Sequence, residues 1–176
     1  PLTLIDVDHG GPAKARNSGA EIARGEFLVF TDDDCRVESN WLQAYEKCFT
    51  ESPYAALGGK TLNLYPESVP AETWSQYMEY LREDLMRDQD GHLLLLISNN
   101  LAYRRDVFLK IGGFNEGFPF AAAEDSELGF RLVGLGYSQS YCPEAIIWHN
   151  HMNDSWGYLR QQFRYGRGYI YFQEIM

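Results

Sequence analysis

A short apolar run that ends in three consecutive aspartates constrains the fold of this chain more than any other segment. Residues 27–30 read Phe-Leu-Val-Phe, and Thr31 and the aspartates at 32–34 follow directly. Continuous apolar runs of this length are typical of strands that are covered on both faces of a parallel sheet. We therefore expect the aspartates in a loop at the carboxyl end of a strand, where open α/β sheets bind their ligands.

A β-α-β unit is predicted around this strand. A helix is expected over residues 13–24, because Pro12 stands in its first turn and Gly25 follows its end. Residues 2–7 are predicted as the preceding strand. Further helices are expected over 41–49, 73–87, 106–111, 126–135 and 155–172, and further strands over 55–64, 93–97, 138–141 and 145–148.

Length and charge exclude several classes of protein. The 176 residues fit one compact domain. The formal net charge of -10 argues against nucleic acid as a partner, because a nucleic-acid-binding protein needs a basic face. An anionic ligand would need a local source of positive charge, such as a metal ion bound by a carboxylate cluster.

The cysteines and the hydropathy pattern bear on the compartment. Cys35, Cys48 and Cys142 are an odd number without a close pair, so we expect neither a disulfide framework nor a zinc site. No apolar run approaches the ~20 residues that cross a bilayer, and no signal-peptide pattern is present. We expect a soluble chain in the reducing cytoplasm, with the cytoplasmic face of the membrane left open as a location.

The acidic cluster has a chemistry of its own. Hard divalent cations such as Mg²⁺ and Mn²⁺ take oxygen ligands, usually from one or two carboxylates with substrate phosphate. Asp32 and Asp34 point to the same side if the backbone there is extended. An acidic triplet alone fits a solvated turn or a helix cap equally well.

Three segments in a fixed order carry a resemblance to a known family. They are residues 11–19 (Gly-Pro-Ala-Lys-Ala-Arg-Asn-Ser-Gly), residues 23–27 (Ala-Arg-Gly-Glu-Phe) and residues 30–34. They resemble the nucleotide-sugar-binding half of family 2 glycosyltransferases. The resemblance implies the GT-A fold, a Rossmann-like α/β architecture with a mixed, mainly parallel sheet flanked by helices.

The same resemblance implies roles for these residues on the donor side. Asp32 would lie near the ribose and the metal, and Asp34 would ligate the Mn²⁺ or Mg²⁺ that bridges the diphosphate. Arg16 and Asn17 would help to hold the nucleotide. Asp33 is also expected among the residues that bind the donor.

The second acidic cluster is Glu124 and Asp125, which precede residues 126–131. Acidic residues at a helix start also complement the helix macrodipole, so a purely structural role is an alternative. The stretch resembles the family's Glu-Asp-x-Glu/Asp-Leu-x-x-Arg-Leu motif, which implies that Asp125 is the catalytic base, with Glu124 beside it. Residues 98–108 and 112–116 also resemble the acceptor-side half.

These matches imply a domain plan and a mechanism. One GT-A domain over 1–176 would hold a nucleotide-sugar-binding half at 1–65 and an acceptor-side half with a C-terminal helix at 66–176. A metal would stabilise the departing diphosphate while Asp125 accepts the proton of the acceptor hydroxyl. Direct displacement of this kind inverts the anomeric configuration. A UDP-sugar is the default donor, and the acceptor is a saccharide, a lipid-linked sugar or a protein.

A late histidine pair offers another metal ligand. Related enzymes often place a metal-binding histidine at the end of a late strand, which is predicted here over residues 145–148. We favour His149 over His151, because His149 continues directly from the apolar run 146–148. The imidazole must be neutral to ligate.

The C-terminal segment carries a partial motif. Residues 161–165 resemble the Gln-x-x-Arg-Trp motif of processive members, but Tyr165 replaces the tryptophan, so processive synthesis is not expected. Arg164 would contact the diphosphate or the acceptor, or it would equally well form the basic face of an amphipathic helix.

The family's usual opening, a βαβ portion ahead of Leu2, has no counterpart here. We therefore expect an N-terminally truncated domain with an exposed sheet edge, which favours homo-oligomers. Peripheral membrane association is left open. Two other functions are also left open: a nucleotidyltransferase, which ordinarily shows a Gly-rich phosphate loop, and a non-catalytic sugar-binding domain.

Overall fold

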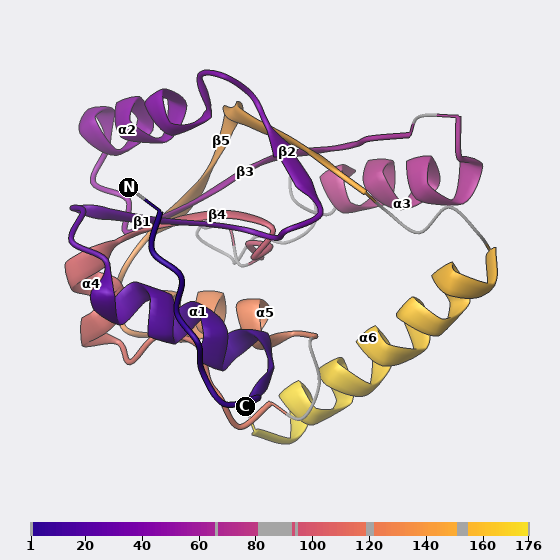
Figure 1. Cartoon of the computed structure of the whole chain (residues 1–176). Coiled ribbons are helices and arrows are strands. Elements are labelled where there is room, and N and C mark those ends of the chain that lie inside the picture. Colours follow the sequence, from indigo (N-terminus) through magenta and orange to yellow (C-terminus); the bar gives the residue numbers. More distant parts are fainter. Residues whose placement is uncertain are drawn as a thin grey trace.

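The computed structural model describes residues 2–65, 67–80, 93, 95–118, 122–150 and 155–175. In this part of the chain a five-stranded sheet with the order β1-β4-β3-β5-β2 is flanked by helices (Figure 1). The elements in chain order are α1 (Gly11–Ile22), β1 (Phe27–Thr31), β2 (Cys35–Val37), α2 (Trp41–Glu51), β3 (Ala56–Asn63), α3 (Val69–Tyr80), β4 (Asn100–Arg104), α4 (Arg105–Lys110), α5 (Glu124–Gly134), β5 (Gln139–His149) and α6 (Ser155–Ile175).

The sheet is mixed, as expected, but the prediction that it is mainly parallel is wrong for the described strands. Only β3 and β5 run parallel. The pairs β1 with β4, β3 with β4, and β2 with β5 are antiparallel. Strand β4 lies between β1 and β3 and runs against both. An apolar run shows that a strand is buried, but it does not show the direction of the neighbouring strand.

Two predicted strands are not present in the residues that the structure describes. Residues 2–7 belong to no strand and are exposed, so the predicted β-α-β unit is absent, and β1 pairs with β4 instead. Of residues 93–97, Leu93 makes a single bridge and 95–97 are irregular, although Leu95 and Leu96 are buried. The apolar pattern of this segment therefore indicated burial and not a strand. The strand that follows it, β4, begins at Asn100.

The remaining sequence predictions hold with shifted boundaries. The strands expected at 138–141 and 145–148 are one continuous strand, β5. Helix α3 starts four residues before the predicted 73, and residues 81–87 of that prediction lie outside the described residues. Helices α1, α2, α4, α5 and α6 were all predicted. The short strand β2 was not.

Helices cover both faces of the sheet, and each face has its own core. Helix α2 packs on one face through Trp41, Tyr45 and Phe49. Helices α1, α4 and α5 cover the other face (Figure 1). There Phe30 of β1 lies 5.3 Å from Phe108 between ring centroids. The two cores hold the sheet rigid, so the loops at its edge are supported from both sides.

Asn100, at the start of β4, ties three strands to α2. Its Oδ1 accepts hydrogen bonds from Trp41 Nε1 at 2.8 Å and from Tyr45 OH at 2.7 Å. Its Nδ2 donates to the carbonyl oxygens of Lys60 at 2.9 Å and Ala145 at 2.8 Å. The β3–β5 register shifts at this point. The buried amide therefore satisfies backbone groups that the irregular ladder leaves unpaired.

The cysteine prediction is wrong. Cys48 of α2 and Cys142 of β5 form a disulfide, with their Cα atoms 6.6 Å apart. Their separation of 94 residues hides the pairing from the sequence, because only the packing of α2 on β5 brings them together. Cys35 is not in a disulfide. None of the helices in the described ranges combines the length and the apolarity that crossing a bilayer requires.

Candidate active site

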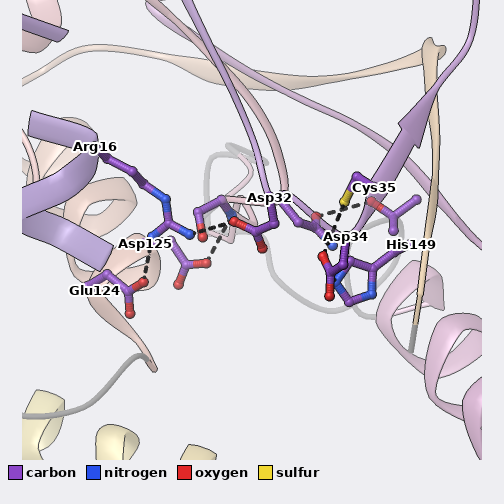
Figure 2. Close-up of polar contacts among 10 residues, drawn as sticks. Arg16, Asp32, Asp34, Cys35, Glu124, Asp125 and His149 are labelled. Carbon is purple, nitrogen blue, oxygen red and sulfur yellow. Dashed lines mark hydrogen bonds and ion pairs between the residues drawn. The ribbon is translucent and has the colours of Figure 1, made fainter. Parts of the chain in front are cut away.

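Both acidic clusters open into one cavity of about 770 Å³. Asp32 and Asp34 reach it from the loop after β1, and Glu124 and Asp125 reach it from the start of α5 (Figure 2). The volume lies in the range of small-molecule sites, roughly 300–1,000 Å³. Segments that are far apart in the sequence thus meet at one site, as the sequence predicted.

Asp34 and His149 form the first part of the site. Strand β2 pairs with β5 so that Cys35 stands opposite His149. The Asn150 N–H donates to the Asp34 carbonyl oxygen at 3.1 Å. This backbone pairing brings His149 Nε2 to 3.2 Å from Asp34 Oδ1. Figure 2 shows the two side chains facing each other.

The donor atoms of this group suit a divalent cation. The ligand atoms of Asp34, Cys35 and His149 lie within 4.8 Å of one another. Burial raises the pKa of the Cys35 thiol to about 11, and a soft sulfur ligand suits Mn²⁺ or Mg²⁺ less well than an oxygen ligand does. A carboxylate oxygen and an imidazole nitrogen remain, and both are ligands that Mn²⁺ accepts. His149 thus lies beside Asp34, its role as a metal ligand stays a prediction, and His151 lies outside the described residues.

Arg16 of α1 joins the two acidic clusters. Its NH2 nitrogen lies 2.9 Å from Asp32 Oδ1, and its NH1 nitrogen lies 2.8 Å from Glu124 Oε1. The guanidinium also lies over the ring of Phe114, 5.5 Å from its centroid. Only 14% of the Arg16 side chain is exposed, so these contacts are little screened by water. Asp32 thus pairs with Arg16 and does not belong to the close group around Asp34.

Glu124 is a buried carboxyl with an unusual proton affinity. Burial and the neighbouring Asp125 raise the pKa of Glu124 to about 7, although Arg16 acts in the opposite direction. Its Oε2 atom has no hydrogen-bond partner in the described part of the chain. Near neutral pH the carboxyl therefore exists as a mixture of its protonated and ionised forms.

Asp125 is held by the backbone. Its Oδ2 accepts the Ser98 N–H at 3.0 Å, and its Oδ1 accepts the Ser126 N–H at 2.8 Å. Ala123, two residues earlier, has a φ of 69°, which is the left-handed conformation that only a minority of non-glycine residues adopt. This turn starts α5 at the cavity wall. A carboxylate that is oriented in this way still has lone pairs that make no hydrogen bond to the backbone. They can accept the proton of a bound hydroxyl.

The predicted nucleotide contact of Asn17 is not supported. Its side chain is engaged with the backbone of Phe114, donating to the carbonyl oxygen and accepting from the N–H, each at 2.9 Å. It also donates to Glu116 Oε1 at 2.9 Å. The Asn17 side chain is not among the residues that line the cavity, and its bonds hold the turn after α4 against α1.

The structure also separates Arg164 and Asp33 from the cavity. Both are exposed, and neither is among the lining residues. Tyr165, the next residue along α6, does line the cavity. Successive helix residues are turned by about 100°, so Arg164 points toward the outer side of α6.

Several lining residues were missed by the sequence analysis. On α6 the cavity residues include Gln161, Tyr165 and Tyr169. Residues four apart lie on the same face of a helix, so this spacing could have identified the α6 face that lines the cavity. Burial raises the pKa of Tyr165 to about 12. On α3 the cavity residues include Ser75 and Tyr77, and no motif pointed to them.

Comparison with known proteins gives consistent results. A sequence family described as "Glycosyltransferase like family 2" matches residues 2–168. Among curated proteins, the O-antigen chain rhamnosyltransferase WbaN of Salmonella anatum is 30% identical over 157 residues, which cover 85% of this chain and 48% of that protein. The pre-mycofactocin glycosyltransferase of Mycobacterium tuberculosis is 25% identical, covering 89% of this chain and 33% of that protein. The chain thus spans about half the length of the first of these relatives.

Solved structures show the same fold. The mannosyltransferase PcManGT from Pyrobaculum calidifontis, in complex with GDP-Man and Mn²⁺, superposes with a TM-score of 0.68 at 20% identity. That match covers 93% of this chain and 43% of the other. GalNAc-T7 with UDP, GalNAc and Mn²⁺ gives a TM-score of 0.59 at 15% identity, over 86% of this chain and 34% of the other. The fold is therefore of the GT-A kind.

Proposed function

The chain belongs to glycosyltransferase-like family 2, and we propose on this premise that it transfers a sugar from a nucleotide-sugar to a hydroxyl acceptor with inversion. The observation that carries the proposal is the single cavity that receives Asp34 with His149 on one side and Asp125 on the other. Sugar transfer needs both functions, because negative charge builds on the leaving diphosphate while a proton leaves the acceptor.

Asp34 and His149 would hold Mn²⁺ or Mg²⁺ on the donor side. A cation bound there would act as a Lewis acid that stabilises charge on the leaving diphosphate. The net charge of -10 makes a local positive charge necessary for an anionic donor. We assign Asp32, paired with Arg16, to the nucleotide side, and a metal contact of its second oxygen stays a prediction.

Asp125 would be the general base. Both of its oxygens are oriented by backbone N–H groups, so the carboxylate is held for an incoming hydroxyl without rearrangement. Glu124 is less suited to this role, because its Oε1 accepts from Arg16 and the carboxyl is partly protonated near pH 7. We assign Glu124 to holding Arg16. Direct attack of the acceptor needs no covalent intermediate and inverts the anomeric carbon.

The domain halves, donor and acceptor follow as parts of the same proposal. Residues 1–65 would bind the nucleotide-sugar, and residues 66–176 would bind the acceptor. UDP is the default nucleotide, although the two similar structures hold GDP-Man and UDP respectively, so both nucleotides need testing. The similarity to an O-antigen chain enzyme supports a role in polysaccharide or glycoconjugate synthesis. An acceptor at the cytoplasmic face of a membrane is part of the proposal.

A donor screen tests the proposal. Purified protein is incubated with UDP- and GDP-sugars, with Mn²⁺, with Mg²⁺ or with a chelator, and nucleoside diphosphate release is measured. We expect release that the chelator abolishes. Unchanged turnover after chelation would reject the metal role, and pyrophosphate release would instead identify a nucleotidyltransferase.

Asp125→Asn tests the base. General base catalysis contributes about 10²–10⁴-fold, so we expect a loss of turnover of that size with donor affinity kept. Asp106→Asn is the matched control, because Asp106 is an exposed aspartate in the first turn of another helix, α4. Full turnover in Asp125→Asn would remove the general base from the mechanism. Donor binding without turnover in the parent protein would favour a non-catalytic sugar-binding domain.

A further inference from the structure

The outer face of α6 carries large apolar side chains that the described chain leaves in contact with solvent. The exposed fractions are 74% for Trp156, 55% for Leu159, 72% for Phe163 and 59% for Ile170. At about 100° per residue these four positions fall within roughly 60° of one another around the helix axis. They form a continuous apolar stripe along the helix.

Basic side chains border this stripe along one side. On the same helical wheel Arg167, Arg160 and Arg164 follow within about the next 80°. The segment 155–175 holds these three arginines and a single acid, Glu174, whereas the whole chain has a net charge of -10. Positive charge is thus concentrated beside the apolar stripe on a molecule that is otherwise acidic.

The opposite face of α6 is occupied by the rest of the protein. Tyr165 and Tyr169 line the cavity, and Phe172 contacts Phe130 of α5 with ring centroids 5.4 Å apart. Gly168 lies so close to Ala122 that an added Cβ would come within 2.5 Å of it. The inner face therefore anchors the helix, and Figure 1 shows α6 along the periphery of the molecule. The stripe is consequently held outward by close packing.

We propose that this stripe, Trp156, Leu159, Phe163 and Ile170 with Arg160, Arg164 and Arg167 beside it, docks the protein on an anionic lipid surface. An apolar face with Trp, Phe and Leu next to arginines is the pattern of helices that lie in the membrane interface. The three arginines complement anionic headgroups, while the acidic remainder of the chain is repelled by them. These two effects together orient α6 toward the lipid.

A second copy of the chain fits this face less well. An antiparallel two-fold pairing of α6 would oppose the three arginines of one chain to those of the other, because it brings the same flank of both stripes together. Like charges at close range destabilise such a contact. The charge of the patch therefore favours lipid over self-association.

Docking in this way would also orient the cavity, and this step rests on the proposed function. The α6 residues that line the cavity are centred roughly 120° around the helix axis from the stripe, and a helix with its side chains is about 10–12 Å across. The reacting hydroxyl would therefore sit roughly one helix diameter from the lipid surface. That position suits a saccharide acceptor whose other end is anchored in the bilayer.

Vesicle sedimentation tests the docking without donor or acceptor. The purified protein is mixed with phosphatidylcholine vesicles with or without phosphatidylglycerol. We expect binding only to the anionic vesicles, weakened by added salt. Because an arginine near an anionic surface contributes about fivefold, replacing all three by glutamine should weaken binding on the order of 100-fold.

The apolar part is tested by Trp156→Gln combined with Phe163→Gln, which should weaken binding by about tenfold or more. Leu42→Gln and Lys47→Gln on α2 are matched controls, because both residues are exposed on a helix of the opposite layer. Thermal unfolding should be unchanged in the Trp156 and Phe163 double variant and in the α2 controls, since these replaced side chains are exposed.

Two results would overturn the docking. One is equal binding to neutral and anionic vesicles, or none to either. The other is parent-like vesicle binding by the Trp156 and Phe163 double variant. If size-exclusion chromatography shows a dimer that this double variant abolishes, the face is a self-association surface instead. Because these measurements need no sugar transfer, a failure here leaves the proposed transfer reaction untouched.

Discussion

Replacing Glu124 by glutamine should stabilise the protein at alkaline pH and not at acidic pH. Glutamine keeps an oxygen that accepts from Arg16, and its NH₂ group takes the place of Oε2, which has no partner in the described residues. The side chain is only 5% exposed, so the difference between a charged and a neutral group is large there.

The sign follows from the raised pKa. Burial and Asp125 raise the pKa of Glu124 from 4.5 to about 7, so the folded state holds its proton more tightly than the unfolded state. The stability that this proton contributes is complete below pH 4.5 and is lost as the pH rises through 7. With about 1.4 kcal/mol for each unit of pKa, the loss is on the order of 3 kcal/mol.

The pKa of about 7 already includes the opposing effect of the ion pair with Arg16. Burial alone would lower the pKa of Arg16, but the carboxylates of Asp32 and then Glu124 raise it, which shows that the guanidinium favours an ionised Glu124. Because Arg16 keeps Asp32 as a partner in the glutamine variant, we expect this contribution to be the smaller one.

Urea unfolding at about pH 4.5 and about pH 8, without metal or donor, measures the effect. The free energy of unfolding of Glu124→Gln relative to the parent should rise by about 3 kcal/mol between these two pH values. Glu46→Gln, at an exposed position on α2, is the control and should show no such rise. A constant difference between variant and parent would refute the buried-carboxyl reasoning. Destabilisation at pH 8 alone would show that the Arg16 ion pair dominates.

Two other predictions concern the metal group and the sheet. His149→Ala should weaken the binding of Mn²⁺ alone, measured by titration calorimetry, by about 100-fold or more, because losing a direct ligand should cost at least as much as losing an outer-shell partner; His9→Ala, at an exposed position, is the control, and equal affinity in both variants would contradict the assignment. Asn100→Ala should lower the free energy of unfolding by about 4 kcal/mol, since four hydrogen bonds of about 1 kcal/mol each are removed. Asn40→Ala, at a helix N-cap without a side-chain bond, should change stability far less, and a similar loss in both would refute the proposed importance of Asn100.

Much of the local structure could be predicted because its causes are local. The apolar run at 27–30 became β1, and Asp32 and Asp34 follow it in the cavity. Helix α6 formed where a helix was expected over 155–172, although it contains three glycines. Motif order also led to Asp125 at the start of α5. The strand and the helices depend on neighbours within a few residues, which is the range over which side-chain periodicity and turn chemistry act. The assignment of Asp125 came instead from the resemblance to a family motif.

The arrangement of the strands and of the site could not be predicted in the same way. Antiparallel β4 lies between β1 and β3, and Cys48 bonds to Cys142, because helices and strands that are distant in sequence pack together. Packing also directs Asn17 to the backbone of Phe114 and turns Arg164 outward.

By itself, then, the sequence determined where most of the helices and the strand before the acidic loop form, and it singled out the candidate site residues. Only the tertiary structure decided that Asp34 pairs with His149 while Asp32 pairs with Arg16. The two aspartates are chemically identical and two residues apart, so nothing local distinguishes them. Their partners come from β5 and α1, and a contact of that kind exists only when the whole sheet has assembled.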